Sequence, residues 1–274
     1  MAFLGRSWDC PDWSGFREWL LSRYCRDEVR TKLCYARRYY RLLLDGDLTP
    51  LHGLSDRKRA HVMRALVALS RYLGCYDLFQ ELRVKAGLKW SKSSDTAIIA
   101  RLSRDSNPVE WALEAKRRVP SLTEFIDFLA ATGLRVVEAI WSWNLLAEKG
   151  PEGYFNPETG ALEHFRHEIF LRRTKKAYIS FIPEELLDTP TEPLTYDTVR
   201  LRLKRAGLKL HLSDLREYWA TYMTRHLTRP EIDMLQGRVG SSVFMAHYFN
   251  PNLIRDLRTR VLKGVAEILE ELQT

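Results

Sequence analysis

Residues 213–250 read SDLREYWATYMTRHLTRPEIDMLQGRVGSSVFMAHYFN. The beginning of this stretch has the apolar spacing of a helix that buries one face, formed by Leu215, Trp219 and Tyr222. Arg216 lies near the N-terminal turn of this predicted helix, where free backbone N–H groups also favour an anion. The stretch therefore puts a cationic side chain at a position suited to an anionic ligand.

A second, shorter helix is predicted directly after the first. Pro230 suits a first helical turn, and Gly237 suits the end of the same helix. Arg238 follows this glycine, and Tyr248 comes ten residues later. Two arginines and a tyrosine are the groups needed to hold a phosphodiester and attack it, because guanidinium groups bind phosphate oxygens and a phenol can act as a nucleophile.

A matching upstream motif, ATGLRVVEAI, occupies residues 131–140. Gly133 is expected to end one helix, and Arg135 starts the next as a further candidate phosphate ligand. Glu138 is expected to accept buried hydrogen bonds and to steady this turn. In order and spacing, the two motifs resemble the signature of the tyrosine recombinases, the lambda-integrase family. That signature is T-G-L-R-x-x-E, then H-x-x-R, a G-H or G-W pair and a nucleophilic tyrosine.

Residues 165–183, FRHEIFLRRTKKAYISFIP, lie between the two motifs. β-Branched and aromatic residues on both sides of a basic middle predict a β-hairpin with its turn at residues 174–176. The family has its catalytic lysine in such a turn, which implies Lys175, with Lys176 as the alternative. His164 and His167 precede the turn without a third ligand, so no metal site is predicted there.

The resemblance implies a mechanism without metal or other cofactor. Tyr248 would attack the scissile phosphorus and form a 3′-phosphotyrosyl link, while Arg135 and Arg216 would hold the non-bridging oxygens. Lys175 would protonate the leaving 5′-oxygen. Because the link retains the ester energy, a second 5′-hydroxyl could reverse the step without ATP. Tyr178 and Tyr196 are the alternative nucleophiles.

Two positions depart from the common family pattern. Ser213 stands where most members have histidine, and serine does not titrate near neutral pH; His211, two residues earlier, is a weak substitute by its register. Arg238 stands where histidine or tryptophan is usual, and it can still donate to a non-bridging oxygen. With these departures the chain looks similar to the integrases of archaeal viruses and plasmids.

The excess positive charge lies in the N-terminal part of the chain. The 274 residues carry a net charge of +8, and residues 1–107 hold 20 Lys and Arg against 12 Asp and Glu, whereas the remainder has 23 of each. Such a bias is expected of a region that binds a polyanion. The candidate DNA contacts are Arg37, Arg38, Arg41, Arg57, Lys58, Arg59 and Arg64.

We therefore predict a mainly α fold with a small antiparallel β-hairpin or sheet. An N-terminal arm (residues 1–11) precedes a helical core-binding domain (12–87), a serine-rich linker (88–108) and a catalytic domain (109–274). Helices are predicted at 13–24, 27–44, 56–73, 77–86, 109–117 and 121–131, the last with Ser121 as N-cap.

The C-terminal helix, residues 252–273, is amphipathic, and it could pack on a neighbouring subunit or on its own core. The four cysteines, Cys10, Cys25, Cys34 and Cys75, are expected to be reduced packing residues. No long apolar run or leader is present, which predicts a soluble, cytoplasmic protein without a membrane partner.

The function predicted from these features is site-specific recombination or integration of double-stranded DNA by a homotetramer on DNA. A DNA relaxer of the type IB topoisomerase kind and a catalytically inactive DNA-binding protein are the alternatives.

Overall fold

The structure, a computed structural model, describes residues 10–90, 98–99, 102–103, 107–172, 175–239, 250 and 253–273. The chain forms two compact units, residues 1–104 and 105–274. The division falls within the stretch predicted as a linker. Helices dominate both units, in agreement with the predicted mainly α class, and a small antiparallel sheet lies in the second unit. Within the described ranges, no helix combines the length and the apolar composition needed to cross a membrane.

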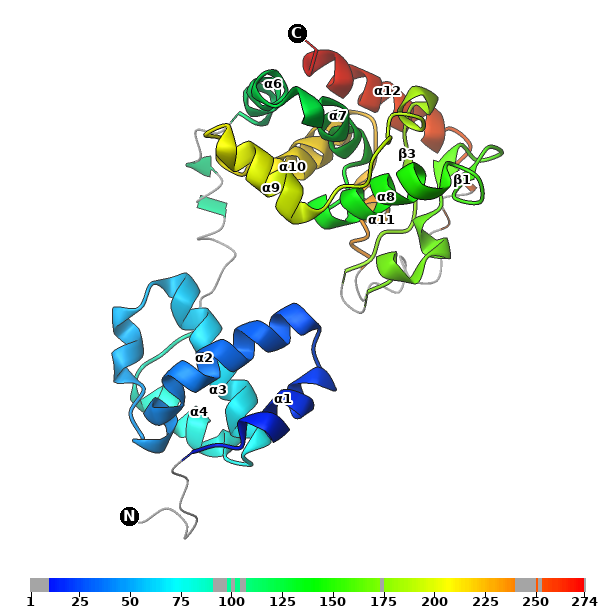
Figure 1. The fold of residues 1–274 in the computed structure, drawn as a ribbon. Coiled ribbons are helices and arrows are strands. Elements are labelled where there is room, and N and C mark those ends of the chain that lie inside the picture. Colours follow the sequence, from blue (N-terminus) through cyan, green and yellow to red (C-terminus); the bar gives the residue numbers. More distant parts are fainter. Residues whose placement is uncertain are drawn as a thin grey trace. The chain divides into compact units, whose positions relative to one another are not determined.

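Unit 1 is a small helical bundle (Figure 1, blue to cyan). Asp12 caps its first helix by accepting hydrogen bonds from the backbone N–H groups of Ser14 and Gly15. The longest two helices, α2 and α3, pack against each other through apolar faces that include Ala36, Val62 and Leu66. The helices of this unit are α1 (Trp13–Leu21), α2 (Arg26–Leu44), η1 (Thr49–Gly53, a 3-10 helix), α3 (Asp56–Tyr72) and α4 (Tyr76–Lys85).

The cysteines of unit 1 are all free thiols. Cys75 is half-buried, but Cys10, Cys25 and Cys34 are exposed, so the prediction that the cysteines are packing residues was wrong for these three. Aromatic side chains, rather than these cysteines, pack the core of unit 1. The ring centroid of the buried Phe16, for example, lies 5.4 Å from that of Tyr72.

Unit 2 is a larger helical domain built around α7 and α10. The buried Trp219 of α10 donates from its indole to the carbonyl of Ala131 at 3.1 Å, which joins the two helices. The α-helices of this unit are α6 (Pro108–Arg118), α7 (Thr123–Thr132), α8 (Val136–Lys149), α9 (Tyr196–Arg205), α10 (Leu212–Tyr222), α11 (Arg229–Leu235) and α12 (Leu257–Glu271). Its short 3-10 helices are η2 (Pro120–Leu122), η3 (His164–Arg166), η4 (Glu168–Phe170), η5 (Glu184–Leu186) and η6 (Met223–Arg225).

The start of α7 differs from its prediction. Pro120–Leu122 forms the 3-10 helix η2, and α7 begins at Thr123, so Ser121 does not cap it. A proline fixes φ but cannot donate a hydrogen bond, which favours a separate tight turn at this point. The Ser121 hydroxyl is instead within 3.4 Å of a guanidinium nitrogen of Arg202.

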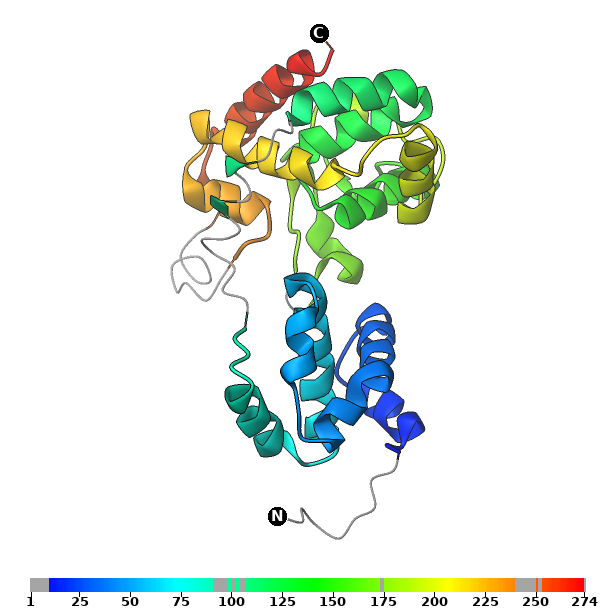
Figure 2. The same cartoon turned by 90° about the vertical axis from the view of Figure 1, so that its left-hand side faces the viewer.

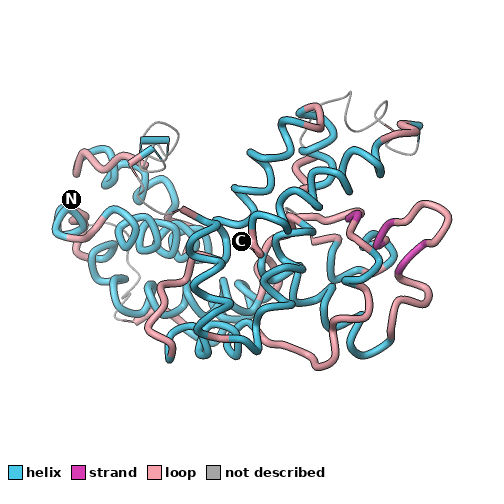
Figure 3. Tube along the Cα trace, turned by 90° about the horizontal axis from the view of Figure 1, so that it is seen from above, coloured by secondary structure: helices cyan, strands magenta, loops and turns pink. Residues whose placement is uncertain are grey.

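The sheet has three short antiparallel strands in the order β1 (Phe155–Asn156), β2 (Ala161–Leu162) and β3 (Ser180–Phe181). They are the magenta segments of Figure 3. The first half of the predicted 165–183 hairpin was wrong, because this part forms η3 and η4 rather than a strand. The chain still returns antiparallel to itself: Leu171 bridges Lys176, and the Ala177 N–H donates to the carbonyl of Phe170 at 3.0 Å.

A buried polar network joins α8 to the sheet. The Tyr154 hydroxyl is 2.7 Å from the Ser142 hydroxyl and also hydrogen-bonds Nδ1 of His164, whose Nε2 lies 2.8 Å from the Ser180 hydroxyl. Burial lowers the pKa of His164 to about 3, so this ring is neutral at physiological pH. His164 therefore has a hydrogen-bonding role within the core.

The last helix, α12, packs on the core of its own unit. Val261, Val265 and Ile268 are buried, and the helix contacts α7, α10 and β3 (red in Figures 1 and 2). Arg260 of this helix donates to the buried carboxylate of Glu231 at 2.6 Å and 3.1 Å, and thereby ties α12 to α11. The apolar stripe of the C-terminal helix is thus covered within the domain.

We predict that Glu231→Gln weakens unit 2 in a pH-dependent way. The hydrogen bond from Arg260 lowers the pKa of Glu231 below its ordinary value of 4.5, so the stabilisation is present at neutral pH and is lost as the pH falls through the folded-state pKa. Urea unfolding at pH 7 should show a loss of about 2–3 kcal/mol. The difference from wild type should shrink below about pH 4.5, where the carboxylate is protonated in the unfolded chain.

Glu152→Gln is the matched control, because Glu152 is exposed and has no ion pair within the described part of the chain. Equal losses in both variants, or a Glu231→Gln difference that does not change with pH, would contradict the prediction.

Candidate functional site

The first side of the site is the junction between α7 and α8. Gly133 ends α7 in the left-handed conformation with φ of 59°, and an added Cβ would lie 2.5 Å from the ring of Trp219. Only glycine fits this turn without strain. The sharp exit puts Arg135 at the N-cap of α8.

Arg216 crosses the centre of the site and is buried. Its guanidinium donates to the carbonyl of Gly133 at 2.8 Å and to the carbonyl of Gln236 at 2.6 Å. These two acceptors come from the α7–α8 junction and from the end of α11, so one side chain joins three helices. The first two predicted arginine motifs are thereby brought together.

Gln236 reinforces this junction from the other direction. Its side chain is buried, and its amide nitrogen donates to the carbonyl of Arg216 at 3.1 Å and lies 3.5 Å from that of Gly133. The Gln236–Arg216 pair is therefore reciprocal. Sequence analysis did not identify Gln236, although its position directly before Gly237 could have drawn attention to it.

The lysine turn packs directly on Gly237. This residue has φ of 61°, and an added Cβ would lie 1.7 Å from the backbone carbonyl oxygen of Lys176. No side chain can fit there, so glycine allows the backbone of the lysine turn to approach. The contact places Arg238, the next residue, beside residues 175–177.

Arg135 completes the connection between the junction and the lysine turn. Its guanidinium donates to the Glu138 carboxylate at 2.9 Å and to the Lys176 carbonyl at 3.3 Å. Glu138 is fully buried and also accepts the backbone N–H of Arg135 at 3.2 Å, as its predicted role requires. A second guanidinium, that of Arg172, hydrogen-bonds the same carboxylate.

Positive charges around the buried Arg216 favour the binding of an anion at this site. Burial lowers the pKa of Arg216, and the nearby positive charges of Arg135 and Arg238 lower it further, while Glu138 raises it. Arginine nevertheless keeps its proton at physiological pH. The charges of Arg135 and Arg238 thus both act on Arg216, and a bound anion would relieve this repulsion.

The structure describes most of the remaining predicted site residues, and these differ in their exposure to solvent. Lys175, Lys176 and Arg238 are exposed, with no ion pair among the described residues. Ser213 is exposed on the first turn of α10, one helical turn before Arg216. Tyr248 lies outside the described residues. Of the alternative nucleophiles, Tyr178 is half-buried and Tyr196 is exposed at the first turn of α9.

His211 has a partner of its own. Its Nδ1 lies 2.8 Å from the buried carboxylate of Asp214, and its ring packs edge-on against Trp111 of α6 at 6.2 Å between centroids. These contacts hold His211 at the junction of α6 and α10. Neither contact joins His211 to Arg216.

The predicted DNA contacts of unit 1 are distributed over α2 and α3. Arg37, Arg38, Arg41, Arg57 and Arg64 are exposed, whereas Lys58 and Arg59 are half-buried. Arg59 is paired with Asp56, so its charge is partly compensated. The exposed set gives unit 1 a positively charged surface.

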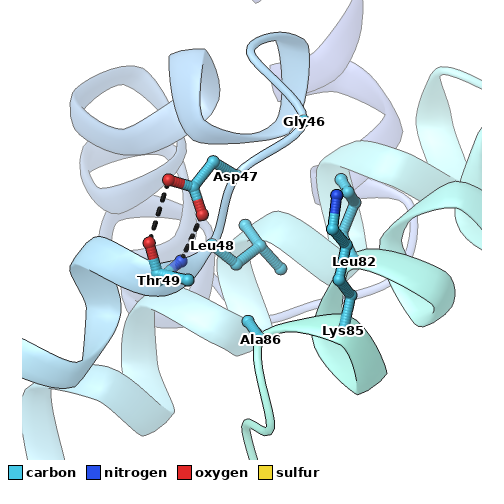
Figure 4. Close-up of a pocket in the computed structure, with 7 residues that line it drawn as sticks. All are labelled: Gly46, Asp47, Leu48, Thr49, Leu82, Lys85 and Ala86. Carbon is cyan, nitrogen blue, oxygen red and sulfur yellow. Dashed lines mark hydrogen bonds between the residues drawn. The ribbon is translucent and has the colours of Figure 1, made fainter.

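One surface hollow, of about 140 Å³, lies in unit 1 beside Asp47, Lys85 and Ala86 (Figure 4). Both carboxylate oxygens of Asp47 are engaged by Thr49, at 2.8 Å and 2.9 Å, which closes the turn before η1. Across the described residues, no three His, Cys, Asp or Glu side chains come together as a possible metal site.

Comparisons of the sequence with models of known protein families and with curated proteins give no match.

We predict that sulfate stabilises the protein through the three guanidinium groups. At ten times its dissociation constant a bound anion adds about 1.4 kcal/mol to the unfolding free energy. Arg238→Gln should gain less from sulfate, and without sulfate it should be as stable as wild type or more stable, because one repelling charge is gone. Thermal unfolding in sulfate and in chloride at equal ionic strength measures both effects.

Arg205→Gln is the control, since Arg205 is an exposed arginine at the end of α9 with no ion pair in the described ranges. It should respond to sulfate as wild type does. An equal sulfate response in Arg238→Gln and wild type would show that the three guanidinium groups do not form one anion site.

Proposed function

We propose that the protein is a tyrosine recombinase that cuts and rejoins double-stranded DNA. The observation that carries the proposal is that Arg216 joins the α7–α8 junction, where Arg135 lies, to the end of α11, while Arg135 and Gly237, the residue before Arg238, both contact the Lys176 backbone. These groups lie far apart in the sequence, and the core contacts of Arg216 and Arg135 do not account for the gathering of the exposed Arg238 and the lysine turn at the same place. A phosphodiester explains it, because its non-bridging oxygens accept such donors.

In the proposed reaction the Tyr248 oxygen forms a bond to phosphorus as the bond from phosphorus to the 5′-oxygen breaks. The guanidinium groups stabilise the charge on the non-bridging oxygens in the transition state, each with a contribution on the order of 3 kcal/mol. Lys175 gives its proton to the departing 5′-oxygen. A 5′-hydroxyl of another strand then attacks the phosphotyrosyl link and releases Tyr248.

Two features of the site affect the proposed reaction: the fixed position of Arg216 and the presence of serine at position 213. The bonds of Arg216 to Gly133 and Gln236 fix its guanidinium before DNA binds, so little reorganisation is needed in the reaction. Ser213 cannot accept the phenolic proton of Tyr248 near neutral pH, since a hydroxyl does not titrate there. The proton must therefore pass to another acceptor, such as water.

The proposed partner is double-stranded DNA, with the exposed arginines of unit 1 as a second binding surface. Strand exchange needs four active sites on two duplexes, which implies a homotetramer on DNA in the cytoplasm of the host cell. Since α12 packs on its own domain, contacts between subunits would use other surfaces or require this helix to rearrange. The alternatives keep the same fold: a DNA relaxer of the type IB topoisomerase kind, or an inactive DNA-binding protein.

We predict a covalent protein–DNA adduct when the protein meets a nicked suicide substrate, in which the short fragment that carries the released 5′-hydroxyl diffuses away. Denaturing electrophoresis should show the adduct with wild type and none with Tyr248→Phe. Arg135→Gln should reduce its rate of formation by about 10²-fold or more. Tyr178→Phe and Tyr196→Phe are the matched controls and should form the adduct. DNA binding without any adduct would identify the inactive alternative, and relaxation without strand exchange would identify the topoisomerase-like one.

We predict that Lys175→Ala loses cleavage of ordinary DNA but regains it on DNA with sulfur in place of the scissile 5′-oxygen. A thiolate is a good leaving group without protonation, so the missing acid no longer matters. Single-turnover cleavage rates of both substrates measure the rescue, and Lys176→Ala is the control. Rescue of Lys176→Ala alone would move the acid to that residue, and rescue of neither variant would contradict the general-acid assignment.

A further inference from the structure

Arg172 is a fourth arginine at the site, and sequence analysis gave it no role. One of its terminal nitrogens, Nη2, hydrogen-bonds the buried Glu138 carboxylate, on the same oxygen, Oε1, that accepts Arg135. Its guanidinium also lies over the ring of Trp141, 4.9 Å from the centroid. These two contacts orient the guanidinium next to that of Arg135.

The Arg172 side chain has donors to spare. About a third of it is open to solvent, with a relative exposure of 34%. Within the described part of the protein, neither Nε nor Nη1 finds an acceptor, and Nε is buried. Buried donors are normally satisfied, so an oriented arginine with unused N–H groups is suited to an external acceptor.

Glu138 alone does not explain this arginine. The carboxylate already accepts both the side chain and the backbone N–H of Arg135, so one guanidinium suffices to neutralise it. The second leaves the Glu138, Arg135 and Arg172 trio with a net charge of +1. Adding Arg216, Arg238 and the two lysines of the turn makes the cluster far more positive than a single phosphodiester can balance.

We propose that Arg172 binds a DNA phosphate adjacent to the one held by Arg135, Arg216 and Arg238. The proposal rests on the proposed function, since it assigns the neighbouring backbone position of the same substrate. Trp141 and Glu138 hold the guanidinium in place, and the solvent-exposed part of the side chain supplies the contact. Arg172 is thus a binding residue that lengthens the cationic site beyond the scissile phosphate.

The salt dependence of DNA binding tests this directly. Log K falls as log salt concentration rises, and each phosphate contact makes this negative slope steeper by about 0.9. Arg172→Gln should make the slope shallower by this amount, so that the affinity ratio of wild type to variant shrinks about 3.5-fold between 50 mM and 200 mM salt. Binding to a mixed-sequence duplex is measured in the Tyr248→Phe background, where cleavage cannot interfere.

Two further variants distinguish a phosphate contact of Arg172 from a purely structural role of this residue. Arg172→Lys should keep the slope, because a phosphate contact needs the positive charge, whereas stacking on Trp141 with bonding to Glu138 needs the planar guanidinium. Arg166→Gln is the matched control: Arg166 also pairs with a buried carboxylate, that of Glu163, and lies over an aromatic ring, that of Phe165. It should leave the slope unchanged.

An unchanged slope in Arg172→Gln overturns the proposal, as does an equal decrease in Arg166→Gln, which would indicate a general charge effect. A decrease in both Arg172→Gln and Arg172→Lys also overturns it, because the role would then be structural. Failure of the proposed function would give a different result: salt-dependent DNA binding would persist while the suicide substrate gave no adduct. Absence of DNA binding by wild type would reject both.

Discussion

The bonds of the buried Arg216 guanidinium to the carbonyls of Gly133 and Gln236 are the constraint on which the site depends. A buried cation is costly unless its N–H groups are satisfied. Satisfying them requires the α7–α8 junction and the end of α11 to meet over α10. The same requirement then brings Arg135 and Arg238 close to Arg216, so packing of the core and assembly of the cationic site are one event.

Two glycines make this assembly sterically possible. Gly133 lets the chain turn beneath Trp219, and Gly237 lets the Lys176 carbonyl approach where a methyl group would collide. Glu138 offsets part of the resulting charge by binding Arg135 and Arg172. Like charges are thus gathered at one place and compensated by a single carboxylate, an arrangement that costs stability and that functional sites often contain.

The two units carry their positive charge in different ways. Unit 1 carries the excess charge on exposed arginines of α2 and α3, as in a surface that contacts many phosphates weakly. Unit 2 has a balanced overall charge but concentrates guanidinium groups at one place, which suits a single, tightly held phosphate. The ion pair between Arg260 and Glu231 holds α11 against α12, and Gly237 follows shortly after the end of α11.

The sequence by itself determined most of the helices and their glycine stops, because these follow from local periodicity and backbone sterics, and it indicated the buried role of Glu138; helix α9 was not predicted. It did not determine the 3-10 turns that replace the first predicted strand, the cap of α7, or the exposure of three cysteines. Nor did it indicate Gln236 and Arg172, whose roles arise from partners 20 or more residues away in the sequence. Only the tertiary structure decided which charges share one carboxylate and which carbonyls accept Arg216, because such contacts depend on distances that close when the core packs.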